Sequence, residues 1–354
     1  MRRSPFWLFV AFALILAACS GADANEGTTT TSTVPTTTTS TTRPTTTTEA
    51  TTTTTEPSGP LSPLNGLAVE DPALLERGVI AVKVDNHWNA RPQSGVQDAD
   101  AIYELLVEAG LTRFIALFHD NDSDYVGPMR SGRPTDPTLL KPLGAIFTIS
   151  GAQDWVASRI VGSGVALIGE VRPATFRISS RRAPHNLYVD TSLLRDYAAD
   201  RSYVSEPPPD LFAWGTFSPD EPAESVTINF SAETTAAWQW DGEQYQRSTN
   251  GELHSWVDKD GQIAPIAADT LVVLFAPLYT ARPSNGGGSA VPATETVGSG
   301  RALVFAEGGV AEGTWSRDTI DEIMQLQGAD GRPLPVPTGV PWISLVPTGR
   351  SVTW

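Results

Sequence analysis

Residues 27–60 read GTTTTSTVPTTTTSTTRPTTTTEATTTTTEPSGP, a tract of threonine and proline with almost no large apolar side chain. Such a composition cannot bury enough apolar surface to offset the entropy of ordering the chain, so we expect no secondary structure there. Any folded core must therefore come from residues 61–354. The tract predicts a tether, since an extended Pro-containing chain of this length reaches roughly 100 Å.

Residues 1–19 read MRRSPFWLFVAFALILAAC, with basic residues, an apolar run and then small residues. This order is typical of a secretory signal peptide. The final LAAC resembles the bacterial lipobox. By that resemblance Cys19 becomes the mature N-terminus and carries a diacylglyceryl group with chains such as palmitate, which is a membrane anchor. The alternatives are an ordinary signal peptide with a stray cysteine and an uncleaved anchor. We therefore expect a lipoprotein signal peptide over 1–19, a disordered tether over 20–60, and an extracytoplasmic protein held at the cell membrane.

The charge balance limits the partners of the folded part. The chain has a formal net charge of -16. Nucleic-acid binding needs a basic face that neutralises phosphates, so we exclude nucleic acid as a partner. Cys19 is the only cysteine, so the exported part contains no disulfide.

Hydrophobic patterning predicts two segments after the tether. Residues 61–210 read as an α/β domain, because short Val-, Ile- and Phe-rich runs alternate with segments of helical spacing. Residues 216–354 read as a smaller, mostly antiparallel β-rich domain with alternating runs and turn signals. The three consecutive prolines of SEPPPD, at 205–210, mark the boundary.

The expected elements of the first segment are strands at 78–86, 98–110, 111–120 and 144–151 and helices at 152–161 and 190–200, the second capped by Asp190 or Thr191. The pattern of 98–110 fits a helix or a strand, and a hairpin with 111–120 is favoured. The expected strands of the second segment lie in 225–230, 236–248, 269–277, 301–317, 339–347 and 351–354, and 285–300 is expected to be a flexible loop. Asp241-Gly242 predicts a hairpin turn.

Motifs for a catalytic nucleophile, a phosphate-binding loop or a zinc-binding helix are absent from the sequence. The histidines lie far apart in sequence, without a metal-ligand partner at helical spacing, so we expect no metal and no cofactor. They are His87, His119, His185 and His254. The sequence leans away from an enzyme and does not indicate a reaction.

The stretch VGPMRSGRP, at 126–134, places Arg130 and Arg133 between prolines and glycines in an acidic chain. Arginine suits bidentate contact with carboxylate or phosphate, and Gly127 and Gly132 would let backbone N–H groups approach an anion. This predicts an anion site. The alternative, that both arginines pair with the chain's own Asp85, Glu104 or Glu108, is about equally favoured.

Other polar residues extend this candidate site. APHNLYVD, at 183–190, sets a histidine and an asparagine before an expected helix, and the histidine could donate a proton or cap backbone groups. The full set of candidate ligand-binding residues is Arg91, Asp100, Glu104, Arg113, Arg130, Arg133, His185 and Asn186.

Several segments, in order, resemble the bacterial YerB-like lipoprotein family, whose function is unknown. They are PLNGLAVED (63–71), AVKVDNHWNARPQSGVQDADAIYELLVEAGLTRFIALF (81–118), VGPMRSGRP (126–134), RRAPHNLYV (181–189), YQRSTNGELHSWVD (245–258), GTWSR (313–317) and PWISLVP (341–347). The resemblance implies an N-terminal α/β domain and a smaller C-terminal β domain, and it supplies no reaction. The family usually has His, one residue and Asp in its C-terminal part. Here His254 and Asp258 are further apart, and we give this pair no role.

A second, narrower resemblance is to the LytR-CpsA-Psr wall-polymer transferases. The order Arg91, Asp100, two apolar strands and Pro128-Met129-Arg130 is similar to their core, which holds a polyprenyl pyrophosphate with arginines and a magnesium-bound carboxylate. Those enzymes have Asp directly after the arginine. This chain has Ser131, which puts metal binding and transfer in doubt.

We therefore expect a lipid-anchored binding or scaffold module for an anionic envelope ligand, such as a cell-wall polymer or a polyprenyl phosphate. The first alternative is a wall-polymer phosphotransferase or hydrolase that uses the same cleft. The second is a protein–protein adaptor that presents a strand edge or an apolar patch.

Overall fold

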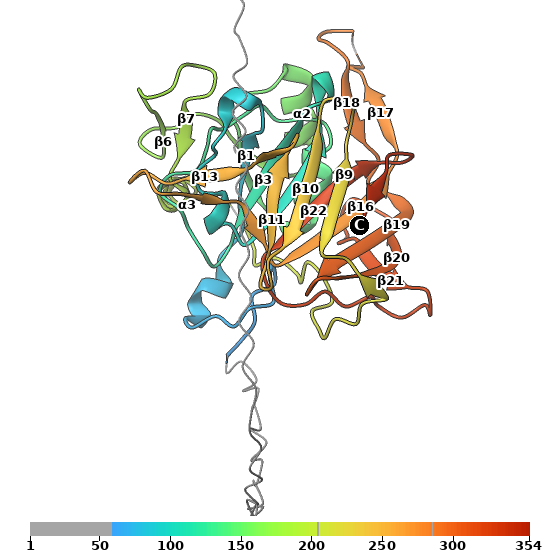
Figure 1. Cartoon of the computed structure of the whole chain (residues 1–354). Helices are drawn as coiled ribbons and strands as arrows, with labels where there is room; N and C mark the ends of the chain where they lie inside the picture. Colours follow the sequence, from blue (N-terminus) through green and yellow to red (C-terminus); the bar gives the residue numbers. More distant parts are fainter. Residues whose placement is uncertain (1–58, 204, 285) are drawn as a thin grey trace, which may run out of the picture. The chain divides into compact units, whose positions relative to one another are not determined.

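The computed structural model describes residues 59–203, 205–284 and 286–354. These residues belong to one compact unit with its own hydrophobic core, so this part of the chain is suited to fold alone. Its centre is a large mixed β-sheet (Figure 1). The strand order is β21-β20-β19-β16-β22-β2-β3-β1-β4-β5, with β8 paired to β20.

The strands of the large sheet are β1 (Ile80–Asp85), β2 (Ala101–Leu106), β3 (Thr112–Phe118), β4 (Ile146–Thr148), β5 (Ala166–Ile168), β8 (Glu221–Pro222), β16 (Thr270–Ala276), β19 (Gly298–Ala306), β20 (Gly309–Arg317), β21 (Gln325–Gly328) and β22 (Pro341–Pro347). The second sheet contains β9 (Ser225–Asn229), β10 (Thr235–Trp240), β11 (Tyr245–Thr249), β12 (Glu252–Leu253), β15 (Ala267–Ala268) and β23 (Val352–Thr353).

Three short antiparallel pairs complete the strands: β6 (Thr175–Arg177) with β7 (Leu187–Val189), β13 (Ser255–Val257) with β14 (Ile263–Pro265), and β17 (Leu278–Ala281) with β18 (Val291–Thr294). The α-helices are α1 (Asp136–Leu140), α2 (Asp154–Gly162) and α3 (Thr191–Asp200). The 3-10 turns are η1 (Pro72–Glu76), η2 (Trp88–Ala90), η3 (Val96–Asp98), η4 (Glu108–Gly110) and η5 (Lys141–Leu143).

Both faces of the large sheet are covered, which explains why β1, β2 and β3 are buried along their whole length. On one face, Val84 and Phe114 share a core with Val226 and Trp238 of the second sheet. On the other face, Ala81 and Ile115 belong to a core that contains residues of α1 and α2. Strands with two buried faces read as continuous apolar runs, as their sequences do.

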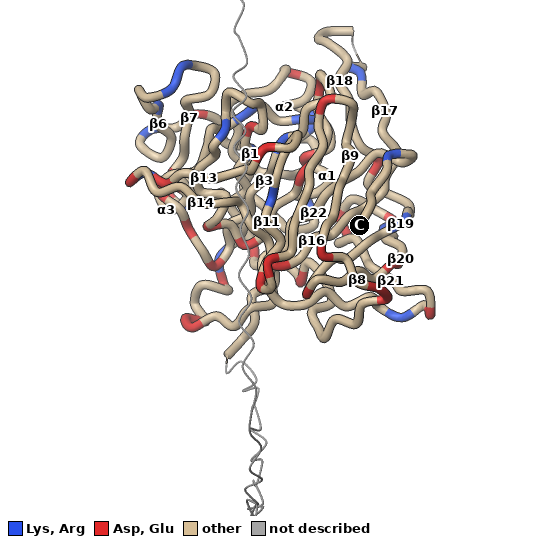
Figure 2. The backbone as a smooth tube through the Cα atoms, in the orientation of Figure 1, with Lys and Arg blue, Asp and Glu red and all other residues tan. Residues whose placement is uncertain are grey.

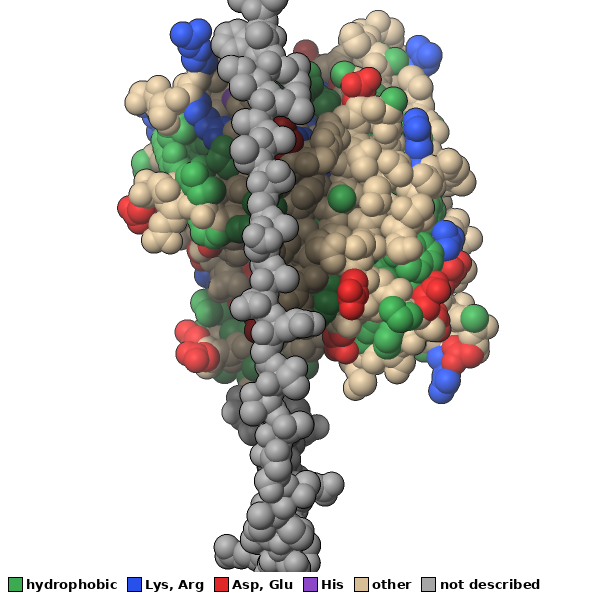
Figure 3. All heavy atoms as spheres, in the orientation of Figure 1, with side chains coloured by type: hydrophobic (Ala, Val, Ile, Leu, Met, Phe, Trp, Pro, Cys, Tyr) green, Lys and Arg blue, Asp and Glu red, His purple; other side chains and the backbone are tan. Residues whose placement is uncertain are grey.

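The outer face of the second sheet is mostly uncharged. Thr227, Gln239 and Gln246 are partly or fully exposed on β9, β10 and β11. Figure 3 shows this surface as mainly uncharged polar side chains and backbone, with acidic and basic groups toward its margins. This surface offers no single-sign field that would attract a strongly charged polymer.

Strand directions bring the loops that matter for function to one edge of the large sheet. β1 runs parallel to β4 and antiparallel to β3, and β2 runs antiparallel to β3 and parallel to β22. The carboxyl ends of β1, β2, β4 and β22 therefore lie at the same edge. In sheets of this kind ligands commonly bind outside the carboxyl ends of the strands.

Several local predictions are confirmed. β2 and β3 form the expected hairpin, closed through Glu108–Gly110. β10 and β11 pair across Asp241-Gly242, and β19 pairs with β20 around Gly308. The side chain of Asp190 caps α3 by accepting a hydrogen bond from the Leu193 N–H at 3.0 Å.

Other expectations change. The sheet is mixed and the helices are few, so the described residues are mostly β rather than clearly divided into an α/β part and a β part. β16 and β22, from 216–354, lie in the same sheet as β2, so the two predicted segments share a core. The expected flexible loop at 285–300 is wrong where β18 and the start of β19 form within it, since Val291, Ala293 and Thr294 of β18 are buried.

The predicted signal peptide, lipidated Cys19 and most of the tether lie outside the described residues. No helix within the described ranges is long and apolar enough to cross a membrane.

Candidate functional site

Asp85, the last residue of β1, is the centre of a polar cluster at the carboxyl edge of the large sheet. Its backbone N–H donates to the carbonyl oxygen of Pro128 at 2.9 Å, and the Arg130 N–H donates to the carbonyl of Lys83 at 2.8 Å. The carbonyl of Arg130 in turn accepts from the Ser150 N–H, just beyond β4, at 3.1 Å. The loop at 126–134 is thereby fixed between the ends of two parallel strands.

The buried carboxylate of Asp85 contacts groups from three segments. His185 Nδ1 lies 2.8 Å from Oδ2, and Arg130 Nε lies 3.3 Å from the same oxygen. The backbone N–H of His87 donates to Oδ1 at 3.2 Å. With Nδ1–H donated to the carboxylate, a neutral His185 keeps Nε2 as its free acceptor. Asp85 therefore orients His185.

His87 stacks on His185, with ring centroids 5.0 Å apart. Burial lowers the pKa of His87, and the charge of Asp85 opposes this shift. His87 is therefore shifted toward its neutral form.

Arg113 stands opposite Asp85 in the β1–β3 pair and completes this cluster, which we call the Asp85 site: Asp85, His87, Arg113, Arg130 and His185. Its Nη1 donates to the carbonyl of Ser131 at 2.8 Å, and no described carboxylate lies within 4.0 Å of its guanidinium. Burial, and then the charge of Arg133, lower the pKa of Arg113 to about 10. Figure 2 shows basic and acidic positions interleaved around these strand ends.

Arg130 is only partly paired. Its side chain is 24% exposed. Its Nε is buried without a hydrogen-bond acceptor, and in the described part of the chain neither terminal nitrogen has a hydrogen bond. Arg130 therefore pairs within the chain only through its 3.3 Å contact with Asp85, so the predicted internal pairing is incomplete for this arginine.

Arg133 is paired within the chain. Its Nε donates to Glu108 Oε2 and its Nη1 to the carbonyl of Gly132, each at 2.7 Å. Burial would raise the pKa of Glu108, but the bond from Arg133 lowers it. The internal-pairing alternative is the better description of Arg133.

The expectation that two glycine amides approach an anion is wrong. The N–H of Gly127 donates to Ser94 and that of Gly132 to Gly151, each at 3.0 Å. A Cβ on Gly127 would lie 2.9 Å from the Tyr188 ring and the Leu187 carbonyl, so glycine is needed here for close packing against β7.

The sequence analysis did not predict a buried ion pair that lies beside the site. Lys83 Nζ and Asp136 Oδ1 lie 2.7 Å apart, and both side chains are fully buried. Burial lowers the pKa of Lys83 to about 8, against the opposing attraction of Asp136. The available signal was a single lysine inside the apolar run IAVKVD.

Glu104 lies on the opposite face of the large sheet from Arg113. Its carboxylate accepts hydrogen bonds from both terminal nitrogens of Arg247, at 2.8 and 2.9 Å. It also accepts from Thr112 Oγ1 at 2.7 Å and from Trp342 Nε1 at 2.8 Å. Both members of the ion pair are fully buried. This Glu104 network joins the two sheets, and Arg247 was not predicted because it lies 143 residues from its partner.

Arg91 and His254 border the Glu104 network. Arg91 Nε donates to Asn86 Oδ1 at 3.0 Å, and burial, followed by the charge of Arg247, lowers its pKa to about 10. The His254 ring contacts Thr249 and Gln93. Burial and the charge of Arg247 lower the His254 pKa well below its usual value, so the ring is neutral.

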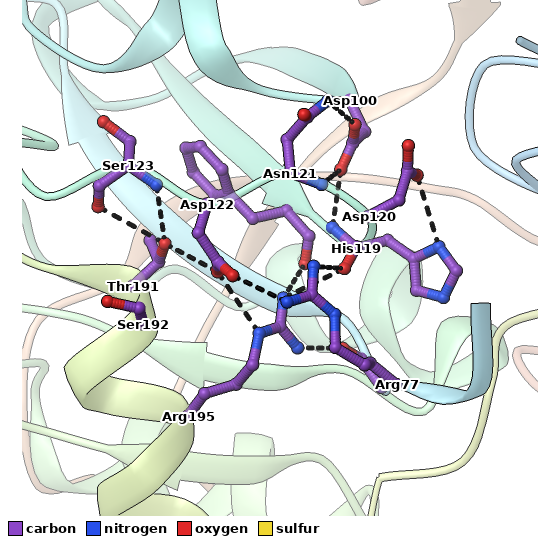
Figure 4. Close-up of polar contacts among 12 residues, drawn as sticks. Arg77, Asp100, His119, Asp120, Asn121, Asp122, Ser123, Thr191, Ser192 and Arg195 are labelled. Carbon is purple, nitrogen blue, oxygen red and sulfur yellow. Dashed lines mark hydrogen bonds and ion pairs between the residues drawn. The ribbon is translucent and has the colours of Figure 1, made fainter. Parts of the chain in front are cut away.

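Asp100 lies at the other end of β2, about 20 Å along the strand from the carboxyl edge. It accepts hydrogen bonds from the His119 N–H and from Asn121 Nδ2, each at 2.6 Å (Figure 4). Burial, and then the nearby Asp120 carboxylate, raise the pKa of Asp100 to about 6. The structure therefore does not bring Asp100 together with Arg113 and Arg130.

The neighbours of Asp100 in Figure 4 were not predicted. Asp122 pairs with Arg77 at 2.7 Å and with Arg195 of α3 at 3.2 Å. Arg195 also donates to the carbonyl of Phe118 at 2.9 Å. These bonds attach α3 to the end of β3, which is a structural role.

Asn186 follows His185 in the sequence but bonds to Arg177 and Ile178 rather than to the Asp85 site. Its Oδ1 accepts from Arg177 at 2.9 Å, and its amide donates to the carbonyl of Ile178 at 3.3 Å. Across the described residues, no group of three or more His, Cys, Asp and Glu side chains could hold a metal ion.

Comparison with known proteins identifies the family. Models described as the N-terminal and C-terminal domains of "Protein of unknown function (DUF3048)" match residues 64–204 and 226–343. The chain belongs to this YerB-like family. The relative named "Putative lipoprotein YerB", from Bacillus subtilis (strain 168), is 28% identical over 305 residues, which cover 81% of this chain and 86% of that protein. The crystal structure of the YerB protein from Bacillus subtilis matches with a TM-score of 0.71 at 25% identity, covering 83% of this chain and 100% of that chain.

Proposed function

We propose that this chain is a lipid-anchored, extracytoplasmic envelope protein that binds an anionic group at the Asp85 site. The anchor rests on the sequence of residues 1–19 and on the name of its YerB relative as a lipoprotein. The anion site rests on the geometry around Arg130. The ligand class is a phosphate or carboxylate group of an envelope component.

The state of Arg130 is the observation that carries the proposal. Neither terminal nitrogen of Arg130 has a hydrogen-bond partner among the described residues, and the side chain is 24% exposed, so hydrogen-bonding capacity at its accessible end is unused. A ligand oxygen would satisfy this capacity. Arg133, by contrast, donates through its Nε to Glu108 at 2.7 Å.

The surrounding groups suit an anion. Arg113 supplies a second positive charge with no described carboxylate in ion-pair distance, while the charges of Asp85 and Glu108 act on it from further away. Arginine's planar fork matches phosphate and carboxylate oxygens in bidentate geometry. When protonated, His185 would donate its Nε2–H to the same ligand.

One observation favours a second candidate function, acid–base catalysis on the bound group. The 2.8 Å contact between Asp85 and His185 Nδ1 is the pairing that orients a histidine as a general base. In that case His185 Nε2 would take a proton from a water or hydroxyl group that attacks the ligand, as in a hydrolase or transferase.

The test is calorimetric titration of residues 59–354 with pyrophosphate, inorganic phosphate and acetate. We expect saturable binding of at least one anion and at least a tenfold loss of affinity in Arg130→Ala, with a smaller loss in Arg130→Lys. Arg332→Ala is the matched control, because that side chain is 83% exposed and, among the described residues, pairs only with Asp330. If Arg130→Ala binds every anion as the wild type does, or if no anion binds, the proposal fails.

A further inference from the structure

A groove beside η2 gathers three strongly exposed apolar side chains. Trp88, Leu253 and Ile263 are 63%, 60% and 64% exposed. They come from η2, β12 and β14, segments far apart in the sequence, and all line one depression of about 420 Å³. Small-molecule pockets commonly measure about 300–1,000 Å³. We call this depression the Trp88 groove.

Polar side chains lie beside the apolar ones in the Trp88 groove. Arg91, Thr249, Glu252, His254 and Ser255 line it. His254 and Thr249 are buried and bonded to each other. Within the described ranges, no hydrogen bond or ion pair engages the side chains of Glu252 or Ser255, and Arg91 Nη1 has no acceptor.

We infer that the Trp88 groove binds a neutral saccharide. A pyranose ring has an apolar C–H face and a rim of hydroxyl groups, and it needs an aromatic surface beside free donors and acceptors. Trp88 provides an exposed indole face, and Arg91 Nη1, the Glu252 carboxylate and the Ser255 hydroxyl provide the polar contacts. The ligand is thus distinct in charge from the one proposed for the Asp85 site.

The groove's charges argue against other occupants. The positive charge of Arg91 is balanced by the negative charge of Glu252, so an anion gains no net attraction there. An alkyl chain would desolvate Arg91 and Glu252 without giving them hydrogen bonds, which is costly. A sugar satisfies both the apolar and the polar side chains of the groove.

The Trp88 groove adjoins the Asp85 site without depending on it. His87 lies between them, with its ring 3.7 Å from that of Trp88 and 5.0 Å from that of His185. Because the groove has its own polar groups, neutral sugar binding should survive the loss of Arg130.

The test is titration of residues 59–354 with chitotetraose, maltotetraose and mannotetraose, followed by calorimetry and by tryptophan fluorescence. We expect at least one tetrasaccharide to bind saturably and to change the fluorescence. Trp88→Ala should weaken that binding at least tenfold, Trp88→Phe less, and Glu252→Gln several-fold. Trp354→Ala is the matched control, since Trp354 is 39% exposed and lies outside the groove.

Three results would overturn the inference: no binding of any of the three sugars, equal binding by Trp88→Ala and Trp354→Ala, or binding of decanoate but not sugar in a Trp88-dependent manner. Arg130→Ala separates this inference from the proposed function, because it should weaken anion binding at least tenfold and leave sugar binding unchanged. Each variant's thermal midpoint is compared with that of the wild type. Trp88 is too exposed for its loss to unfold the protein, so a loss of binding with an unchanged midpoint reports the groove.

Discussion

Replacing Glu104 with Gln tests whether the Glu104 network holds the two sheets together. The change is isosteric, but it removes the negative charge that faces the buried Arg247. Glu104 accepts hydrogen bonds from Thr112, Trp342 and both terminal nitrogens of Arg247 at 2.7–2.9 Å. Both members of the ion pair are fully buried. Breaking a buried pair by removing one partner costs about 3–5 kcal/mol, and we expect Glu104→Gln to lower the free energy of unfolding by that amount.

The assay is urea unfolding of residues 59–354 in a double-mutant cycle with Arg247→Met. The double variant leaves no unpaired charge, so it should lose less stability than the sum of the single variants, with a coupling of at least about 2 kcal/mol. Glu312→Gln is the control, because Arg301 pairs with Glu312 in the same bidentate manner at 2.7 Å but at the surface. It should cost less than about 1 kcal/mol. Additive single variants, or a loss below about 1 kcal/mol for Glu104→Gln, would refute the reasoning.

Three further variants test local parts of the fold by urea unfolding. The pKa of Asp100 in the folded protein is about 6, above the ordinary 3.8, so the folded state keeps this proton to a higher pH than the unfolded state does. Stability should fall by up to about 3 kcal/mol as pH rises from 4 to 7, and Asp100→Asn should flatten this fall; an unchanged slope would contradict the shift. Asp190→Ala removes the cap on α3 and should cost about 1 kcal/mol, whereas no loss would mean that the cap is not formed. Gly127→Ala places a Cβ 2.9 Å from β7 and should lower the free energy of unfolding by more than about 1 kcal/mol. Its control, Gly162→Ala, would place a Cβ with no neighbour outside its own helix backbone within 4 Å and should be neutral or stabilising. Equal effects of the two variants would contradict the close packing at Gly127.

The sequence predicted well wherever local chemistry decides the structure. The Asp241-Gly242 turn, the Asp190 cap and the β2–β3 hairpin each depend on a few adjacent residues, and each is present. The family resemblance likewise rested on contiguous motifs and is confirmed.

The candidate site was less predictable, because its composition depends on which face of the sheet and which end of a strand each side chain occupies. Side chains alternate between faces, and Glu104 pairs with Phe114, so Glu104 and Arg113 point to opposite sides of the sheet. Asp100 belongs to the far end of the same strand. Both separations follow once the hairpin register is known, which sequence patterning alone does not supply.

Long-range partners had no local signal. Arg247 meets Glu104 across 143 residues, and His185 meets Asp85 across 100. Asp85 was considered only as an internal partner of the arginines, yet it is the residue that joins His185 and Arg130 into one site.

The most direct test of the anion site is a crystal of residues 59–354 soaked in selenate, with data collected at the selenium edge. The account predicts an anomalous peak about 4 Å from the Arg130 guanidinium carbon, with oxygens in hydrogen-bond reach of Arg130 and His185. The peak should be absent from crystals of Arg130→Ala. A structure in which selenate binds only elsewhere, or in which Arg130 closes onto Asp85 with both terminal nitrogens bonded to the protein, would contradict it.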